Sequence, residues 1–383
     1  MATNSTNAKK RTSIVNRRAI EKELNAFFSV NNSAAPTPDA GEVVRSGIIT
    51  WGEDNDFPQK LLRLYDSSPT LQSIIEGTAD YISGNGLTEI APEIEYFAKR
   101  VNDDGNDLYD IVDLVGWNTE TFGGAFILVA RTLDKQHVCG LLVLDARRVR
   151  IKADGTGIRY YYMKNGELTA KFEEYQFFTG LGADYDTAAV EEVYFWRGRR
   201  PRGVYSRPRY AAALRAIDTQ IRIQDYFANL VENNFTVCGI LTVPSDGLTP
   251  DQQKELRDNI NKTYSGHRVA GRLMVQFVSN KDLAAQYTSV SANDLDKQYT
   301  EVAKSTRENI YAAFRAIPAL FGIMTETTGF SQQEFLDAFN LYNLTVIAPR
   351  QKDIVRIFSE IFDIERPFQI LPFNFKDSTT DAA

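Results

Sequence analysis

Acidic side chains are the residues of this sequence best suited to chemistry. Asp184 and Asp186 lie two positions apart, and Asp145 could join Glu191 and Glu192 further along the chain. Carboxylates grouped in this way can bind Mg²⁺ in a nuclease or another DNA-processing enzyme. No lysine-supported strand motif joins these residues, so a magnesium enzyme is kept only as an alternative. Loss of nuclease activity in Asp184→Ala would support it.

Histidine, cysteine and glycine patterns predict no other catalytic centre. His137 and His267 lie in unrelated contexts, and with Cys139 and Cys238 they fit no zinc motif. The chain lacks the G-x-x-x-x-G-K-[ST] loop of P-loop ATPases, and its G-x-G triplets are typical of turns. The Asx-rich run 102–107 fits a solvated loop better than a calcium loop. We therefore expect no enzyme, no catalytic residue, no metal site and no cofactor.

Arginines are concentrated in one short stretch. They could contact phosphates or an acidic neighbouring subunit by bidentate pairing. Equally, they could lie in a solvated loop and pair locally. Both interpretations stay open for this set, which comprises Arg197, Arg199, Arg200, Arg202, Arg207 and Arg209.

Size and charge limit the possible functions. The 383 residues carry 43 basic and 50 acidic side chains, and residues 1–45 have a net charge of +3 against −10 for the rest. Proteins that grip nucleic acid by neutralising its phosphates are usually basic, so tight DNA binding is not expected. Two cysteines far apart indicate free thiols in a reducing compartment. The N-terminus has no apolar signal core and the chain has no 18-residue apolar run. We therefore expect neither secretion through a signal peptide nor insertion into a membrane.

The first half of the chain predicts an α+β fold behind a disordered basic arm that could hold a short helix at 16–29. Helix signals start at Pro58 and Pro69, and a third helix spans 108–122. Strands follow at 125–131 and 138–144. Tyr160–Met163 lead into Asn165-Gly166, which is a strong hairpin signal, and 190–196 form a further strand.

The second half predicts long helices around a βαβ insert. The first helix, 208–234, carries alternating charges at Arg215, Asp218, Arg222 and Asp225. The insert has strands at 237–243 and 273–278, and between them a helix that a Thr249–Gln252 capping box opens. Further helices span 294–317 and 332–362. Pro349 should kink the last one, because it lacks an N–H and clashes with the Thr345 carbonyl.

An apolar loop between two helices is the most informative stretch. Ser331 and Glu334 form a capping box and Phe330 with Phe335 a hydrophobic staple, so a helix begins immediately after the loop. A Gly-containing apolar loop held between two rigid helices is suited to contact a partner that moves past it. Its residues are Leu320, Phe321, Gly322, Ile323, Met324, Thr325, Glu326, Thr327 and Thr328.

Several short blocks, in order over about residues 50–365, resemble tailed-bacteriophage portal proteins. Each block is degenerate alone, and their order and spacing carry the resemblance. AIPALFGI (316–323) followed by SQQEF (331–335) is the most specific match. The others are FPQKLLRLY (57–65), 68–75, ISGNG (82–86), TFGGAFI (121–127), LLVLD (141–145), RPRYAAAL (207–214), NNF (233–235) and GILTVP (239–244).

This resemblance implies a domain order. Residues 1–47 would be the arm, 48–206 an α/β wing, and 207–236 and 293–317 the two stem helices. Residues 237–292 would form the βαβ clip, 318–330 the tunnel loop, 331–365 a kinked helix and 366–383 a tail. A crown, which portals often have, would be absent or vestigial. Ser206 stands where a glycine is common before the first stem helix.

The resemblance also implies a function. Copies of the chain would form a ring, typically a dodecamer, at one capsid vertex, through which double-stranded DNA is packaged and ejected. Partners would be the terminase large subunit, the major capsid protein and a head-tail adaptor, first in the host cytoplasm and then in the virion. The loop would line the channel, the stem charges would pair between neighbours, and Arg197, Arg199, Arg200 and Arg202 would touch a subunit or DNA. A head-tail adaptor or another structural protein of the phage is the second alternative, although adaptors are usually shorter.

Overall fold

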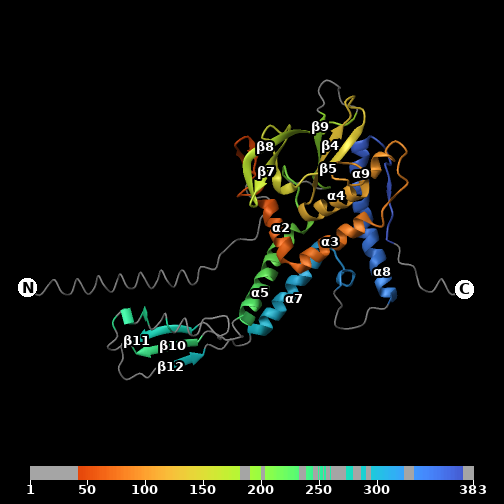
Figure 1. Cartoon of the computed structure of the whole chain (residues 1–383). Coiled ribbons are helices and arrows are strands. Elements are labelled where there is room, and N and C mark those ends of the chain that lie inside the picture. Colours follow the sequence, from red (N-terminus) through yellow and green to blue (C-terminus); the bar gives the residue numbers. More distant parts are fainter. Residues whose placement is uncertain are drawn as a thin grey trace, which may run out of the picture. The chain divides into compact units, whose positions relative to one another are not determined.

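The computed structural model describes most of the chain (Figure 1). The predicted helix at 16–29, and nearly all of the predicted arm, lie outside the described residues. Residues 42–47, which we assigned to the arm, belong to the fold: β1 (Val44–Arg45) pairs with β2 (Ile48–Ile49). The described residues are 42–181, 190–199, 203–232, 239–244, 249, 251–252, 254–255, 259, 273–278, 286–289, 295–322 and 332–373.

Three helices open the α+β part as predicted. They are α2 (Phe57–Ser67), α3 (Pro69–Ser83) and α4 (Leu108–Phe122). The side chain of Ser68 caps α3 by accepting from the Leu71 N–H at 3.2 Å. Asp107 and Asp110 form a capping box at the start of α4, so the Asx-rich run ends as a helix cap. Gly123, at φ 81°, ends α4 in the left-handed conformation that glycine favours.

A six-stranded sheet follows in the order β5-β4-β9-β8-β7-β6. The pair of β4 with β5 and the hairpin of β7 with β8 are confirmed, and Asn165 and Gly166 both have positive φ in its two-residue turn. The parallel pairing of β8 with β9 was not predicted. The strands are β4 (Ala125–Arg131), β5 (Val138–Val143), β6 (Val149–Ile151), β7 (Gly157–Lys164), β8 (Glu167–Phe177) and β9 (Glu191–Trp196).

Aromatic stacking ties the start of the folded chain to the segment before the first long helix. Trp51 stacks on Tyr205 with ring centroids 4.4 Å apart, and Phe126 meets Trp51 edge-on at 6.1 Å. Trp51 and Phe126 are 1% exposed and Tyr205 is 2% exposed. The carboxylate of Glu42 also accepts the backbone N–H of Tyr205 at 3.3 Å. The contact of Glu42 explains why the folded part begins before our predicted boundary at residue 47.

Helices α5 (Leu214–Glu232) and α7 (Leu295–Phe314) form an antiparallel pair. Tyr210, just before α5, stacks on Phe314 at the end of α7 at 5.0 Å, and Tyr226 stacks on Tyr299 near the other end at 4.6 Å. The predicted helix start at 208 is wrong by six residues, because Arg209–Ala213 form the 3₁₀ turn η3 and α5 begins at Leu214. The Tyr210 hydroxyl holds this turn by donating to the Thr121 carbonyl at 2.8 Å.

The insert between these helices contains the predicted parallel strands. β10 (Gly239–Pro244) pairs in parallel with β11 (Leu273–Val278), as a βαβ unit requires. The capping box of Thr249 and Gln252 is present, with helical residues at 251–252, 254–255 and 259. An antiparallel strand that we did not predict, β12 (Gln286–Ser289), pairs with the other edge of β10.

The last long helix is interrupted where we predicted a kink. Helix α8 (Gln332–Tyr342) passes through a π-helical turn, η5 (Asn343–Ile347), into α9 (Ala348–Phe362). Pro349 occupies the first turn of α9, where its missing N–H is tolerated. The wider π turn takes up the irregularity that proline imposes on the preceding residues. The proposed cap at Ser331 lies outside the described residues.

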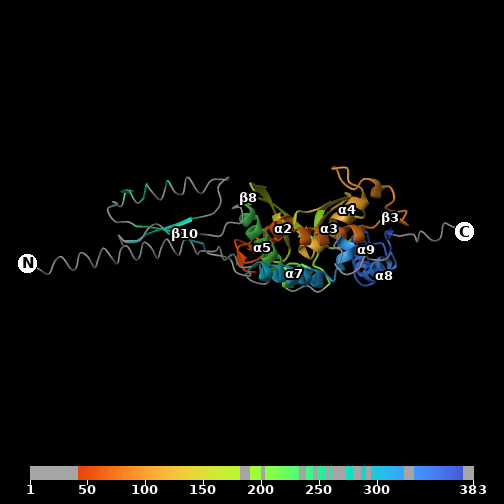
Figure 2. The same ribbon diagram turned by 90° about the horizontal axis from the view of Figure 1, so that it is seen from below.

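The described fold also contains two 3₁₀ turns, η1 (Phe97–Lys99) and η2 (Ala146–Arg148), and the paired strands β3 (Leu87–Thr88) and β13 (Gln369–Ile370). In the view from below, α4 lies on one side of the folded body and α7 and α8 on the other (Figure 2). In the part of the chain that the structure describes, none of the helices has the length and apolar character that crossing a bilayer requires.

Candidate functional site

The predicted channel loop starts from a firmly packed root. Pro318–Phe321 form the 3₁₀ turn η4, which Gly322 ends in the left-handed conformation at φ 79°. The Phe321 ring lies 5.7 Å from that of Tyr342 and 6.3 Å from that of Tyr81, edge-on to both. Leu320 also packs against the main core. Leu320, Phe321 and Gly322 thus anchor the loop, while Ile323–Thr328 lie outside the described residues.

Tyr81 on α3 is the centre of this anchor. Its ring also meets those of Phe339 on α8 at 5.7 Å and Phe373 at 5.9 Å. One turn earlier on α3, the Thr78 hydroxyl is 3.0 Å from the Tyr342 hydroxyl. The loop root and α8 are therefore fixed on α3, and a shift of α8 would have to break several aromatic contacts together.

Arg199, one of the four predicted contact arginines, pairs within its own chain. Its Nε donates to both carboxylate oxygens of Asp353 on α9, at 2.7 and 2.6 Å, and a terminal nitrogen donates to the Pro349 carbonyl at 2.5 Å. Its side chain is still 46% exposed. Arg197 is exposed, whereas Arg200 and Arg202 lie outside the described residues. Arg199 is thus paired with Asp353 and Pro349 of its own chain.

A buried ion pair lies beside this arginine. Glu120 on α4 is fully buried, and its two carboxylate oxygens accept from Nε and a terminal nitrogen of Arg350 at 2.5 and 3.1 Å. Burial opposes the charge of Arg350, yet the Glu120 carboxylate raises the pKa of that guanidinium. Sequence reasoning missed both residues, because 230 positions separate them and no local pattern links them.

Arg209 lies beside the same carboxylates at a greater distance. Its Nε is 3.7 Å from Glu120, and a terminal nitrogen is 3.9 Å from Asp353. Burial and the neighbouring charge of Arg350 both lower the pKa of the Arg209 guanidinium. We call the five residues Arg199, Arg209, Arg350, Glu120 and Asp353 the arginine cluster.

The four charged residues predicted on the first long helix have different surroundings. Arg222 donates to Asp218 at 2.8 Å, which is an i,i+4 pair within α5. Arg215 lines a groove between α5 and α7, and Asp225 is exposed. The pair of Asp218 and Arg222 therefore already satisfies two of the residues that we expected to reach a neighbouring subunit.

The carboxylates that could serve a magnesium enzyme are not gathered at one site in the described structure. Asp145 caps η2 and binds Arg147 at 2.7 Å. Glu192 is fully buried and pairs with Arg131. Asp184 and Asp186 lie outside the described residues. Within the described ranges, no group of three or more His, Cys, Asp or Glu side chains could hold a metal ion.

Comparison with known proteins identifies the family. The model of the family described as phage portal protein matches residues 89–353. This match spans more than half of the chain. The chain belongs to the phage portal protein family. No curated protein matches it.

Solved portal and neck structures share the fold. An HK97 family phage portal protein from Corynebacterium diphtheriae is 10% identical with a TM-score of 0.50, covering 79% of this chain and 88% of that one. A chain in the neck of a native gene transfer agent (GTA) particle, computed with C12 symmetry, is 16% identical with a TM-score of 0.51 and covers 90% and 89%. Another, in the neck of an empty GTA particle computed with C6 symmetry, is 16% identical with a TM-score of 0.52 and covers 82% and 84%. The α+β fold class that we expected is thus confirmed.

Proposed function

We propose that this portal-family chain forms a ring, with twelve copies, at one vertex of a phage capsid. Double-stranded DNA would pass through the ring during packaging and ejection. The family match over residues 89–353 carries this proposal. The C12 symmetry of the neck that contains a structurally similar chain supports the subunit number.

Each part of the chain then has a role. The antiparallel pair α5–α7 acts as the stem, and the insert with β10, β11 and β12 acts as the clip. The clip would dock the terminase motor first and the head-tail adaptor later, while the wing, with its six-stranded sheet, would meet the major capsid protein. The segment after Gly322 would face the DNA, because η4 anchors its start against α3.

The charge of the chain suits a conduit. Its net charge is −7. A basic channel wall would bind the DNA phosphates, and each such contact would slow the movement of the duplex through the channel. An acidic to neutral channel lets the duplex slide. The channel would work by shape and charge, without a catalytic residue or cofactor.

Labelling the chain in assembled particles tests the proposal. A C-terminal affinity tag visualised with gold should mark one vertex per particle in electron micrographs, and particles lacking the chain should contain no DNA. Label on many vertices or along the tail would instead support another head-tail structural protein. Nuclease activity lost in Asp184→Ala would favour the magnesium enzyme.

A further inference from the structure

A cavity of about 770 Å³ lies between the end of α3, the 3₁₀ turn η1 and the start of α4, and it opens to the surface. Leu87, Ala98 and Leu108 contribute apolar side chains to its wall. Phe373, the last residue that the structure describes, also lines it. The chain therefore leaves the described fold at the edge of this cavity.

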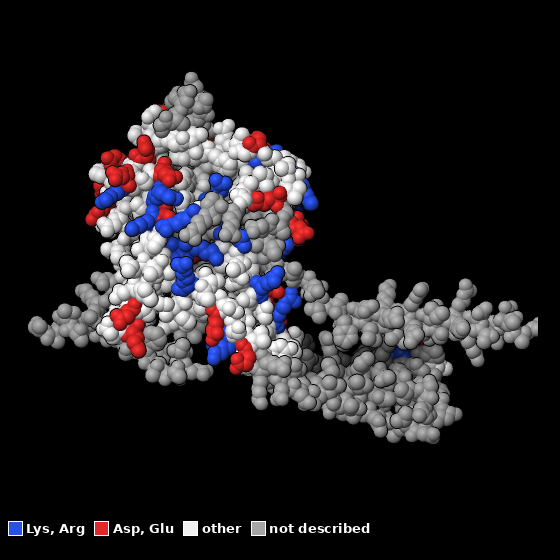
Figure 3. Space-filling model, turned by 180° about the vertical axis from the view of Figure 1, so that it is seen from behind, with Lys and Arg blue, Asp and Glu red and all other residues white. Residues whose placement is uncertain are grey.

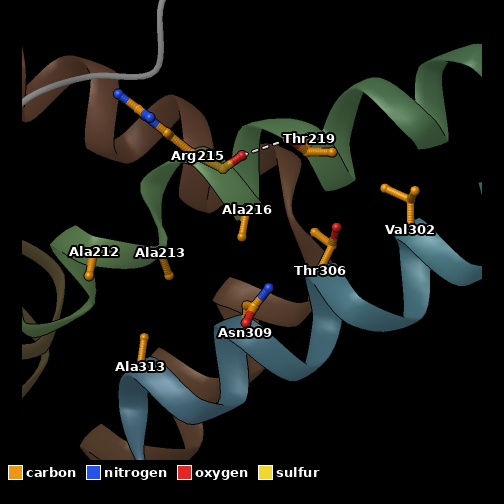
Figure 4. A pocket seen from close by; sticks show the side chains of 9 residues that line it. All are labelled: Ala212, Ala213, Arg215, Ala216, Thr219, Val302, Thr306, Asn309 and Ala313. Carbon is orange, nitrogen blue, oxygen red and sulfur yellow. Dashed lines mark hydrogen bonds between the residues drawn. The ribbon is translucent and has the colours of Figure 1, made fainter.

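The chemistry of this cavity differs from that of two other parts of the surface. The groove between α5 and α7 is lined mainly by small side chains, among them Ala212, Ala213 and Ala216 (Figure 4). On the rear face of the molecule, Lys and Arg side chains gather near the middle (Figure 3). The cavity beside Phe373 instead offers large apolar side chains. An apolar side chain suits it, because filling the cavity removes apolar surface from water.

The last described residues run along the rim of the cavity. Beyond the antiparallel pair of β13 with β3, the Leu371 N–H donates to the Gly86 carbonyl at 2.9 Å. The Asn85 N–H donates to the Leu371 carbonyl at 2.8 Å. These two hydrogen bonds hold the chain against the cavity as far as Phe373.

Phe375 is the next large apolar residue of the sequence. Residues 374–383 read NFKDSTTDAA, and Phe375 is the only large apolar side chain among them. Side chains two positions apart in an extended chain point to the same side. An extended backbone after Phe373 would therefore direct Phe375 to the side on which the ring of Phe373 lines the cavity.

We propose that Phe375 occupies the cavity beside Phe373 and so fastens the segment that follows β13 onto the wing helices of the same chain. The ring of Phe373 lies 5.9 Å from that of Tyr81, which also contacts Phe321 at 6.3 Å. The contact would thus support the residue that anchors the loop root. It lies within one chain, so its failure would leave the proposed ring in place.

Hydrogen exchange of the full chain at low concentration tests this contact. Phe375→Ser should make the amides of Asn85 and Leu371 exchange about tenfold faster, because the rim of the cavity loses the burial of one aromatic side chain. Phe375→Leu should keep most of the protection, since leucine is also apolar. Thr379→Ala is the matched control in the same segment and should exchange as the wild type does. Unchanged exchange in Phe375→Ser would overturn the proposal.

A fluorine probe decides where the side chain lies. Trifluoromethyl-phenylalanine in place of Phe375 should give a fluorine NMR signal that a nitroxide on Lys99→Cys broadens, because Lys99 lines the cavity. The same nitroxide on Lys164→Cys should leave the signal sharp, because β8 and β3 lie at opposite sides of the body in Figure 2 and Lys164 ends the strand paired with β8. Both labels need a Cys139→Ser/Cys238→Ser background, so that only the introduced thiol reacts. A signal that neither label broadens, or that both broaden equally, would refute the contact and leave the cavity to another occupant.

Discussion

The ring of Phe321 lies directly against Gly77, although the two residues are far apart in the chain. A Cβ atom placed on Gly77 would be 3.0 Å from Cε1 and 3.1 Å from Cδ1 of Phe321. The glycine leaves the space on α3 that the loop root occupies. This contact connects the wing helices to the segment that we propose to face DNA.

Gly77→Ala should therefore destabilise the protein. The added methyl group overfills the site and should lower the free energy of unfolding by about 1–3 kcal/mol, despite the better helix propensity of alanine. Gly116→Ala on α4 is the control, because its Cβ would lie 3.5 Å from Ile82 Cγ2 at an ordinary contact distance. That variant should be as stable as the wild type or up to about 1 kcal/mol more stable. Equal urea midpoints for both variants would show that Phe321 does not occupy the site.

Glu120→Ala should lower the free energy of unfolding far more than the loss of a surface ion pair does. It leaves the guanidinium of Arg350 buried without its carboxylate partner. The free energy of unfolding should therefore fall by about 3–5 kcal/mol. Arg63→Ala is the control, because it removes an exposed pair with Asp56 at 3.2 Å and should change stability by less than about 1 kcal/mol. Similar losses in urea unfolding for both variants would contradict a structural role of the buried pair.

Asp80→Asn should stabilise the dilute monomer at neutral pH. Because the folded protein raises the pKa of Asp80, ionising this carboxyl opposes folding, and stability is lost as the pH rises through that pKa. Asparagine removes this effect, so the gain in melting temperature should shrink as the pH falls toward the ordinary aspartate value of 3.8. A variant less stable than the wild type at pH 7 would contradict this.

Deleting residues 323–328 should impair packaging and leave the subunit folded. Leu320 and Phe321 pack in the core, so a deletion that starts at Ala319 would destabilise the subunit as well. The shorter deletion keeps η4 and its terminating Gly322 in place. Ring formation by electron microscopy and DNA content of particles measure the two effects separately. Normally filled, infectious particles would refute the channel role of this segment.

The sequence predicted well those elements whose turns and helix ends are specified by residues close together in the chain. Asn165-Gly166 specify a tight hairpin turn, and Pro58 and Pro69 lie in the first turns of α2 and α3. Each of these signals acts within a few residues. Pro349 likewise marked the interruption of the last helix, although its form as a π turn depends on packing.

Relationships between distant segments could not be predicted from one sequence. The place of β9 between β4 and β8, the pair of Glu120 with Arg350, and the contact of Phe321 with Gly77 all depend on how separate elements meet. The arginine-rich stretch was recognised as a candidate, but its local partner Asp353 lies on α9. Only the fold showed that Arg199 is paired within the chain, while Arg209 lies 3.7 Å from Glu120 and 3.9 Å from Asp353.

Electron microscopy of the purified protein can show whether its copies close into a ring. We expect closed rings with rotational symmetry, twelve subunits and an axial opening wide enough for a DNA duplex. Monomers or open filaments at every protein concentration and salt condition would contradict this expectation.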